Sequence, residues 1–318
     1  KSYTSVEYKS STEERRLEMI QDVFDIYRER NIFPTLHFNN EGVSNEIIKC
    51  RDKDVSYDGD VLNLRFNQGS ALCRFLFPNL FKVECKGVKD NAPYDRFMND
   101  HKLKRAIEFC LKFKKNCTPS SLKDGIDMIG GNVATNFKAM NAKALYEKYC
   151  PEGGIIYDFS AGFGGRMLGA LTSKKNFSYV GTEPNTESYD GLIVLGNHIE
   201  RTLCRKDVFK VIKKGSEDFS PTITEWADFA FSSPPYFTLE KYSDEETQCY
   251  IKYPTLDEWF EGYVKGTIKN IYRALVEDSY YAVNIADFKV GSKNIKYVDR
   301  WIEMSEEMGF EYVEQIHM

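Results

Sequence analysis

The four residues Ser233-Pro234-Pro235-Tyr236 have the types and the order to hold a planar amine. They follow the apolar run 228–231, and because proline cannot donate a hydrogen bond to a sheet, a strand must end there. The Ser233 hydroxyl and nearby carbonyls can accept hydrogen bonds from an exocyclic amine, while Tyr236 can stack on the ring that carries it. This geometry would orient the amino nitrogen for in-line attack on a methyl sulfonium, which needs orientation more than a strong base. The alternative is a rigid turn with packing aromatics.

A glycine-rich turn follows the apolar run 155–157 and leads into a predicted helix. Glycine allows positive φ and a close approach of backbone to ligand, and the helix N-terminus offers free N–H groups. This pattern predicts the first crossover of a Rossmann-like fold. The turn does not fit the dinucleotide order G-x-G-x-x-G and lacks a G-K-[ST] phosphate cradle, so S-adenosylmethionine fits better than NAD or ATP. We predict cofactor contacts at Ser160, Ala161, Gly162, Gly164 and Gly165.

Acidic residues follow the predicted strands that come with this turn. Glu183 lies 21 residues after Gly162, and an acid about 20 residues on can accept both ribose hydroxyls of a nucleoside. Asp158 is predicted to face the sulfonium or the amino group of the methionine part, or else to act as a turn carboxylate. Ser216 and Glu217 follow the third strand and are predicted to lie beside the adenine, with an ordinary turn as the alternative.

Together these segments resemble the amino-methyltransferase family of DNA methyltransferases, including uncharacterised methylases of phages and mobile elements. The resemblance rests on Asp158-Phe159-Ser160-Ala161-Gly162-Phe163-Gly164-Gly165, on Glu183 and on Ser233-Pro234-Pro235-Tyr236, and it covers residues 125–318. It implies methyl transfer from S-adenosylmethionine to an exocyclic base amine, with S-adenosylhomocysteine as product. It also implies that Asn136, Phe137 and Lys138 flank the methionine end of the cofactor. The turn departs from the family's D-P-F-x-G-S-G pattern at Phe159, Ser160 and Gly165.

The first residue of the catalytic signature suggests which base is modified. In this family serine is commoner in cytosine-N4 enzymes, whereas aspartate or asparagine is commoner in adenine-N6 enzymes, so Ser233 implies cytosine N4 and leaves adenine N6 as the alternative. No cysteine follows a proline, which disfavours cytosine C5 methylation. Related protein and ribosomal-RNA enzymes usually carry Asn-Pro-Pro-Tyr. RNA as substrate, and a non-catalytic nucleic-acid-binding subunit, stay open.

A duplex DNA substrate would require base flipping, because a stacked amine cannot reach the cofactor. Tyr236 is the predicted stacking platform, assisted by Phe237. The basic segment 101–115 holds six Lys or Arg and one Glu, so Lys104, Arg105 and Lys112 are candidates for phosphate contacts, with a solvated helix face as the alternative. The same two interpretations apply to a second basic run, made of Arg201, Arg205, Lys206, Lys210, Lys213 and Lys214. The aromatics Tyr242, Tyr250, Tyr253 and Trp259 are expected to line the target pocket or to pack a lid.

Composition excludes several classes of protein. The chain of 318 residues is 42% hydrophobic and 29% charged, with a net charge of −5, which disfavours disorder and does not by itself favour nucleic-acid binding. No apolar run approaches the roughly 20 residues of a membrane span. The eight cysteines form no C-x-x-C pair and the four histidines are far apart, so we predict no metal site, free thiols and a cytoplasmic location. The resemblance implies that the cell is bacterial or phage-infected.

The predicted fold is α/β: a Rossmann-like class I methyltransferase fold with a mostly parallel sheet, after an N-terminal α+β region. We expect two domains, residues 1–116 for DNA contact or target recognition and residues 117–318 for catalysis, or a further recognition domain or subunit. A capped helix is expected from Ser11 and a strand at 61–66. Strands are expected at 155–157, 178–180, 209–212, 228–231, 280–283 and 311–313, with the last strand of the fold missing beyond them.

Overall fold

The computed structural model describes residues 3–318, which form two compact units. The first, here called the helical unit, comprises the N-terminal segment through His37, Pro78–Thr135 and Glu240–Tyr242. The second, here called the sheet unit, comprises Phe38–Phe77, Asn136–Leu239 and Ser243–Met318. This division differs from the predicted boundary between residues 116 and 117, because segments distant in sequence pack together within each unit.

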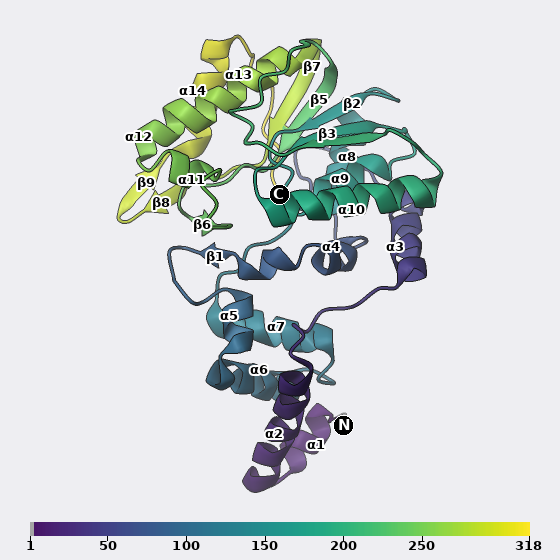
Figure 1. Cartoon of the computed structure of the whole chain (residues 1–318), viewed down its shortest axis with the longest axis vertical. Coiled ribbons are helices and arrows are strands. Elements are labelled where there is room, and N and C mark those ends of the chain that lie inside the picture. The colour runs from purple at the N-terminus through teal and green to yellow at the C-terminus, as the bar shows by residue number, and fades with distance from the viewer. Residues whose placement is uncertain (1–2) are drawn as a thin grey trace. The chain divides into compact units, whose positions relative to one another are not determined.

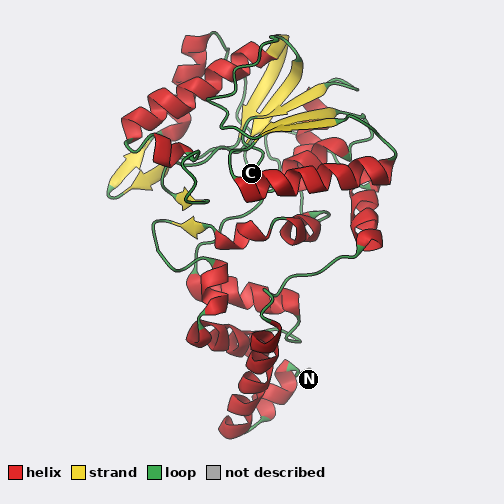
Figure 2. Cartoon of the chain, in the orientation of Figure 1, coloured by secondary structure: helices red, strands yellow, loops and turns green. Residues whose placement is uncertain are grey.

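The helical unit consists almost entirely of helices (Figure 2). They are α1 (Ser5–Ser10), α2 (Glu13–Arg30), η1 (Pro78–Lys82), α5 (Pro93–Met98), α6 (Asp100–Phe113) and α7 (Pro119–Gly130). Its only strands among the described residues are β1 (Glu84–Cys85) and β6 (Glu240–Lys241), which pair antiparallel. The N-terminal region is therefore helical rather than α+β. Leu122 and Ile126 of α7 pack into the same core as Leu103 and Ile107 of α6, which places α7 in this unit.

Two local predictions for the N-terminal half need correction. The first helix is present as α2, but its cap is Thr12, whose side chain accepts the N–H of Arg15, and not Ser11. The strand expected at 61–66 does not form, because this segment has no neighbour in a sheet; Val61 makes one isolated bridge to His317.

The sheet unit contains a five-stranded parallel sheet of order β4-β3-β2-β5-β7 (Figure 1). Its strands are β2 (Ile155–Asp158), β3 (Ser178–Thr182), β4 (Phe209–Ile212), β5 (Ala227–Ser232) and β7 (Leu275–Val283). This confirms five of the six predicted strands and the Rossmann-like class. The sixth prediction is wrong: residues 311–313 are exposed and irregular, and the chain continues to the bridge between His317 and Val61.

Helices cover both faces of the sheet (Figure 1). One face carries α8 (Ala139–Tyr149), α9 (Gly165–Leu171) and α10 (Thr186–Leu203), and the other carries α13 (Lys265–Ala274) and α14 (Tyr297–Met308). The strand order reverses between β2 and β5, the point at whose carboxyl edge sheets of this class bind ligands. Shorter elements complete the unit: α3 (Asn40–Asp52), α4 (Ser70–Leu76), α11 (Cys249–Lys252), α12 (Leu256–Glu258), η2 (Trp259–Val264), β8 (Phe288–Val290) and β9 (Lys293–Ile295).

Lys143 of α8 connects the C-terminus of α3 to the sheet unit. Its buried ammonium donates to the backbone carbonyls of Cys50, Arg51 and Lys53 at 2.9, 3.1 and 2.7 Å. All three hydrogens of the ammonium are thereby used on carbonyls that end α3 without a helical partner. A single side chain of the Rossmann-like core therefore closes the C-terminus of α3.

In residues 3–318 no helix combines the length and the apolar character that crossing a bilayer requires. Over the same residues, no three side chains of His, Cys, Asp or Glu come together in a metal-binding group.

Candidate active site

The end of β5 lies beside the glycine-rich turn at the end of β2, because the two strands are paired in parallel. Ser232, the last residue of β5, is fully buried, and its hydroxyl donates to Asp158 Oδ1 at 2.7 Å. The same hydroxyl lies 3.2 Å from the carbonyl oxygen of Ser160 in the turn. The strand then stops at Pro234 and Pro235 as predicted. The structure thus brings the Ser-Pro-Pro-Tyr segment and the glycine-rich turn together.

The turn requires glycine for two different reasons. Gly162 has a φ of +61°, and a Cβ there would meet no atom closer than 3.8 Å, so backbone conformation rather than crowding selects glycine. At Gly165 a Cβ would lie 2.0 Å from the Phe137 carbonyl oxygen, so close packing selects it. The segment before α8 is therefore pressed against the turn, and Asn136 Nδ2 donates to the Phe163 carbonyl at 2.8 Å. Lys138 lies further out, with its Nζ 3.5 Å from the Leu64 carbonyl.

Asp158 is engaged inside the protein, whereas the sequence suggested a residue facing the methionine part of a ligand. Its carboxylate is completely buried. Oδ2 accepts hydrogen bonds from Arg166 Nε at 2.9 Å and from the Tyr179 hydroxyl at 2.8 Å, and Oδ1 accepts from Ser232. Arg166 also donates to the Ser160 carbonyl. Asp158 therefore acts as the turn carboxylate of the alternative interpretation, locking β2, β3, β5 and α9 beneath the turn.

Glu183 closes the other side of the turn. It is 7% exposed, and its two oxygens accept the backbone N–H groups of Gly162 at 2.8 Å and Asn185 at 2.9 Å. Burial raises the pKa of Glu183 to about 7, against the opposing effect of the two N–H donors. An acid beside a glycine turn at the carboxyl edge, with lone pairs left over, can accept further hydrogen bonds from a ligand.

Ser216 and Glu217 follow β4, at the same edge of the sheet. Ser216 is buried, with its hydroxyl 2.7 Å from that of Thr267. The Glu217 side chain is 2% exposed, and its Oε1 accepts from Lys252 Nζ at 2.6 Å. Its Oε2 is buried and has no hydrogen-bond partner within residues 3–318. Burial raises the pKa of Glu217, although the Lys252 ammonium opposes this.

These residues fit a nucleoside ligand. Glu183 retains acceptor capacity at the turn, and Glu217 Oε2 is a buried acceptor without a partner in residues 3–318. A buried unpaired carboxylate oxygen costs free energy unless a donor reaches it, which a ligand with hydroxyl or amino groups supplies. No cation for a phosphate chain stands in the turn, since Arg166 is bound to Asp158.

Ser233 and Tyr236, the two predicted catalytic side chains, are each held by residues from elsewhere in the sheet unit. Asn284, which follows β7, donates from Nδ2 to the Ser233 hydroxyl oxygen at 3.0 Å. Tyr236 is half-buried, and its ring makes edge contacts with Phe288 and Tyr297 at centroid distances of 5.9 and 5.6 Å. These contacts hold the ring in place beside the proline turn. Sequence reasoning missed Asn284 and Lys252, although a polar residue directly after the predicted strand 280–283 was a signal for Asn284.

Phe237 is not available as a base-stacking residue. It is 6% exposed, has a φ of +47°, and its ring packs against Trp259 with centroids 5.8 Å apart. Trp259 is itself fully buried, and its indole donates to Cys249 Sγ at 3.3 Å. The Tyr250 hydroxyl donates to the Ser243 carbonyl. These aromatics therefore make internal contacts in the chain that follows the Ser-Pro-Pro-Tyr segment, within the sheet unit.

The predicted phosphate-binding residues lie on α6 of the helical unit, and two of the three have partners. Lys104 Nζ stands 4.6 Å from the centre of the Phe24 ring, and Lys112 pairs with Glu108 at 2.7 Å. Arg105 is exposed. The helix itself is confirmed, with Leu103, Ala106, Ile107, Cys110 and Leu111 buried. Of the three candidates, Lys112 has a carboxylate partner and Arg105 is exposed, while the apolar residues face the core, as in an amphipathic helix with a solvated face.

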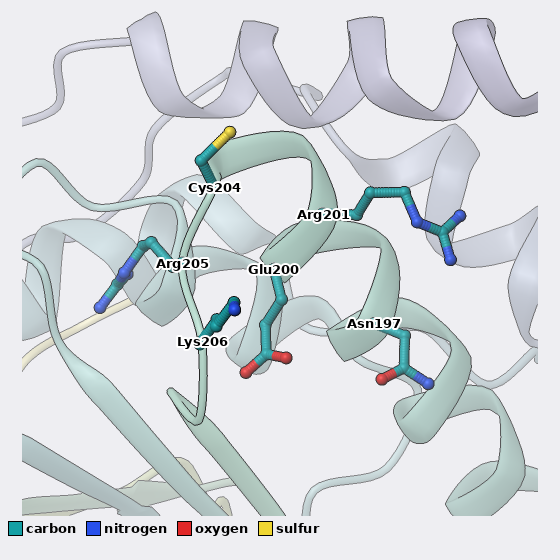
Figure 3. A pocket seen from close by; sticks show the side chains of 6 residues that line it. All are labelled: Asn197, Glu200, Arg201, Cys204, Arg205 and Lys206. Carbon is teal, nitrogen blue, oxygen red and sulfur yellow. The ribbon is translucent and has the colours of Figure 1, made fainter.

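Part of the second basic run lines a pocket at the C-terminal end of α10 (Figure 3). Arg205 donates to the carbonyls of Leu171, Asn176 and Phe177, and Glu200 accepts the N–H of Val208. Because Phe177 directly precedes β3, this pocket lies at the amino edge of the sheet, opposite the candidate active site. It makes no contribution to that site.

Comparison with known proteins gives a likeness of fold only. No protein-family model matches the chain, and no curated protein sequence matches it. Among solved structures it is similar to a TehB-like S-adenosylmethionine-dependent methyltransferase from Corynebacterium glutamicum, with 17% identity, a TM-score of 0.34, and coverage of 57% of this chain and 77% of that chain. It is also similar to the [4+2]-cyclase SpnF, with 12% identity, a TM-score of 0.39, and coverage of 55% and 60%.

A third similar structure is an S-adenosylmethionine-dependent methyltransferase from Aquifex aeolicus, with 14% identity, a TM-score of 0.35, and coverage of 54% of this chain and 80% of that chain. The chain thus spans less than two thirds of the cyclase. At such identities a shared fold does not transfer an activity. The chain is an α/β protein of the Rossmann-like type, and its function has to be inferred from its own residues.

Proposed function

We propose that this protein transfers a methyl group from S-adenosylmethionine to the exocyclic N4 amine of a cytosine in DNA. The observation that carries the proposal is the junction of β2 and β5, where the Ser232 hydroxyl donates to Asp158 and lies 3.2 Å from the Ser160 carbonyl oxygen. This junction places a turn suited to a nucleoside cofactor next to Ser233-Pro234-Pro235-Tyr236, a segment suited to an amine on a planar ring.

The chain's own residues would hold the cofactor from three strand ends. Glu183 would accept the ribose hydroxyls, Glu217 Oε2 would accept the adenine amine, and the backbone around Gly162 would approach the methionine part. S-adenosylmethionine supplies, when bound, an electrophilic methyl group on a positively charged sulfur. Asn136 would act by holding the turn through the Phe163 carbonyl, to which it donates at 2.8 Å.

The transfer itself would depend on orientation. Ser233 would accept one hydrogen of the target amine, and the carbonyls of the proline turn would accept the other, so that the nitrogen lone pair faces the methyl group. Tyr236 would stack on the base, its ring being fixed by Phe288 and Tyr297. No strong base is required, because the amine gives up its proton to solvent only after the carbon–nitrogen bond has formed.

DNA as the partner rests on the resemblance of the Ser-Pro-Pro-Tyr segment and its neighbours, and serine at position 233 favours cytosine over adenine. The base would be flipped out of a duplex to reach Tyr236. Arg105, which is exposed on α6, is the candidate for a phosphate contact. Sequence recognition is assigned either to the N-terminal residues or to a further domain or subunit. A role in restriction–modification or in a phage would follow from this activity.

The experiment is to incubate the protein with tritiated S-adenosylmethionine and mixed bacterial and phage DNA, digest the DNA to nucleosides and identify the labelled one. We expect label in N4-methylcytosine. Ser233→Ala and Tyr236→Ala should reduce the label at least tenfold. Ser56→Ala, in an exposed irregular segment, is the matched control and should leave the label unchanged.

Other outcomes would change the assigned base, the substrate class or the assignment as an enzyme. Label in N6-methyladenine would keep the site and mechanism but overturn the assignment from Ser233. Label in RNA or protein alone, tested in parallel, would overturn DNA as substrate. If calorimetry detects no binding of S-adenosylmethionine, the enzyme proposal fails, and a non-catalytic nucleic-acid-binding role takes its place.

A further inference from the structure

Asn284 is held directly against the catalytic candidate Ser233 by the pairing of β5 with β7. In this parallel pair Ser232 is in register with Val283. The ladder continues one step further, because the backbone N–H of Asn284 donates to the Ser232 carbonyl at 2.9 Å. Asn284 and Ser233 are therefore the first residues beyond two neighbouring strands, both at the carboxyl edge of the sheet.

Asn284 makes two contacts with the Ser233 hydroxyl, and they have opposite directions. The hydroxyl stands 3.3 Å from the Asn284 backbone carbonyl, to which it can donate its one hydrogen. The hydroxyl oxygen also accepts from Asn284 Nδ2 at 3.0 Å. Since the hydrogen of Ser233 is directed at the carbonyl, the side-chain group that faces the oxygen must be the NH₂ donor and not the amide oxygen.

Counting the hydrogen-bonding capacity of Ser233 then gives a definite result. A serine hydroxyl has one hydrogen and two acceptor positions. The hydrogen and one acceptor position are taken by Asn284, which leaves one acceptor position and no donor. A free serine could turn its hydroxyl to donate or to accept, but this one can only accept.

We infer that Asn284 is a positioning residue that fixes Ser233 as a hydrogen-bond acceptor and thereby selects a substrate that presents an N–H at this point. This inference rests on the proposed function and deepens it. An exocyclic amine, as in cytosine or adenine, satisfies the remaining acceptor position. A ring carbonyl in the same place, as in uracil or thymine, would bring its oxygen against the Ser233 oxygen. Both oxygens are acceptors, and no hydrogen would lie between them.

The test combines three variants with a measurement of methyl transfer and of cofactor binding. Asn284→Ala removes the donor and should lower kcat about tenfold, the effect of one hydrogen bond worth about 1.4 kcal/mol, with the Kd for S-adenosylmethionine unchanged. In a Ser233→Ala background the same substitution should have no further effect, because Asn284 acts through Ser233. An undiminished tenfold effect in that background would overturn the inference.

Asn284→Asp tests whether the direction of the hydrogen bond to Ser233 matters, because it keeps the shape of the side chain and removes the NH₂ donor. The carboxylate is nearly isosteric but cannot donate, so Ser233 would turn its hydrogen toward it and lose its role as acceptor. We expect a loss at pH 8 at least as large as that of Asn284→Ala, with recovery relative to the unsubstituted protein as the carboxyl is protonated toward pH 5. A loss that is the same at every pH would indicate a merely structural role and would contradict the inference.

A spectroscopic measurement keeps this inference separate from the proposed function. In protein labelled with ¹⁵N-asparagine, the side-chain NH₂ signal of Asn284, assigned by its loss in Asn284→Ala, should shift in Ser233→Ala. If the unsubstituted protein methylates no base but the signal shifts, the hydrogen-bond assignment stands and the proposed activity fails. If the signal does not move, the assignment itself is overturned, whatever the activity.

Discussion

Glu183 at the end of β3 holds the glycine-rich turn at the end of β2, since its Oε2 accepts the backbone N–H of Gly162 at 2.8 Å. The other oxygen accepts the N–H of Asn185 at 2.9 Å, at the start of α10. One buried carboxylate thus links two neighbouring crossovers of the sheet. Any ligand that hydrogen-bonds to this carboxylate is sensitive to its charge.

The binding of S-adenosylmethionine should strengthen as pH rises through about 7. Burial raises the pKa of Glu183 to about 7, so the carboxylate that would accept the ribose hydroxyls is mostly protonated at pH 6 and mostly ionised at pH 8. Isothermal titration calorimetry at pH 6, 7 and 8 measures this. Glu183→Gln should bind more weakly and lose the pH dependence, and a dependence that persists in this variant would assign it to another group.

The raised pKa of Glu183 should also affect stability. Whereas cofactor binding is expected to strengthen as pH rises, the free energy of unfolding is expected to fall. The pKa of Glu183 rises from 4.5 in the unfolded chain to about 7 in the folded protein, so the folded state binds the proton more tightly. This contribution to the free energy of unfolding is complete below pH 4.5 and is lost as pH rises through 7. The loss is on the order of 3 kcal/mol. Urea unfolding between pH 5 and 8 measures this. The free energy of unfolding should fall more steeply with pH in the unsubstituted protein than in Glu183→Gln.

Replacing Lys252 should destabilise the protein through Glu217. The Lys252 ammonium lies 2.6 Å from Glu217 Oε1, and the Glu217 side chain is 2% exposed, so Lys252→Met leaves a buried carboxylate without its cation. We expect a loss of about 2 kcal/mol, partly recovered by adding Glu217→Gln. The matched control is Lys265→Met, which removes a pair with Glu261 that is about half exposed and should leave stability almost unchanged. Equal losses in both variants, measured by urea unfolding, would contradict the role given to the buried pair.

Lys143→Met should release α3 from the sheet unit. The substitution leaves the carbonyls of Cys50, Arg51 and Lys53 without the donor that reaches each of them. We expect a loss of about 3 kcal/mol and faster amide exchange in residues 47–53, measured by hydrogen–deuterium exchange. Lys174→Met removes an exposed pair with Asp54 and serves as the control, with no change in exchange expected.

Phe237→Ala and Tyr236→Ala should affect different properties. Phe237 is 6% exposed and packs on Trp259, so its truncation should lower the free energy of unfolding by about 3 kcal/mol. Tyr236 is half-buried at the candidate site, and its truncation should mainly lower methyl transfer. Unfolding and activity are measured on both variants. A stable Phe237→Ala protein with lost activity would restore Phe237 as a substrate contact.

Much of the sheet unit follows from the sequence itself. Short apolar runs ending in Asp158, Glu183 or Ser233 mark strands whose carboxyl ends carry polar groups, and strands in a parallel sheet bring such ends to one edge. The glycines after Asp158 and the two prolines after Ser233 have local steric causes, which are visible in sequence. These features predicted β2, β3 and β5, and the apolar runs 209–212 and 280–283 predicted β4 and β7.

Only the tertiary structure decided which polar side chains form their hydrogen bonds within the protein and which can face a ligand. Asp158 accepts hydrogen bonds from Arg166, Tyr179 and Ser232. These partners lie on α9, β3 and β5, and the sequence pattern of one segment does not show that they meet. The burial of Phe237 and the capping of α3 by Lys143 likewise depend on packing between distant segments. Asn284 reaches Ser233 because β7 pairs with β5. Side-chain pairing across strands depends on register, and register is set by the whole sheet rather than by any single segment.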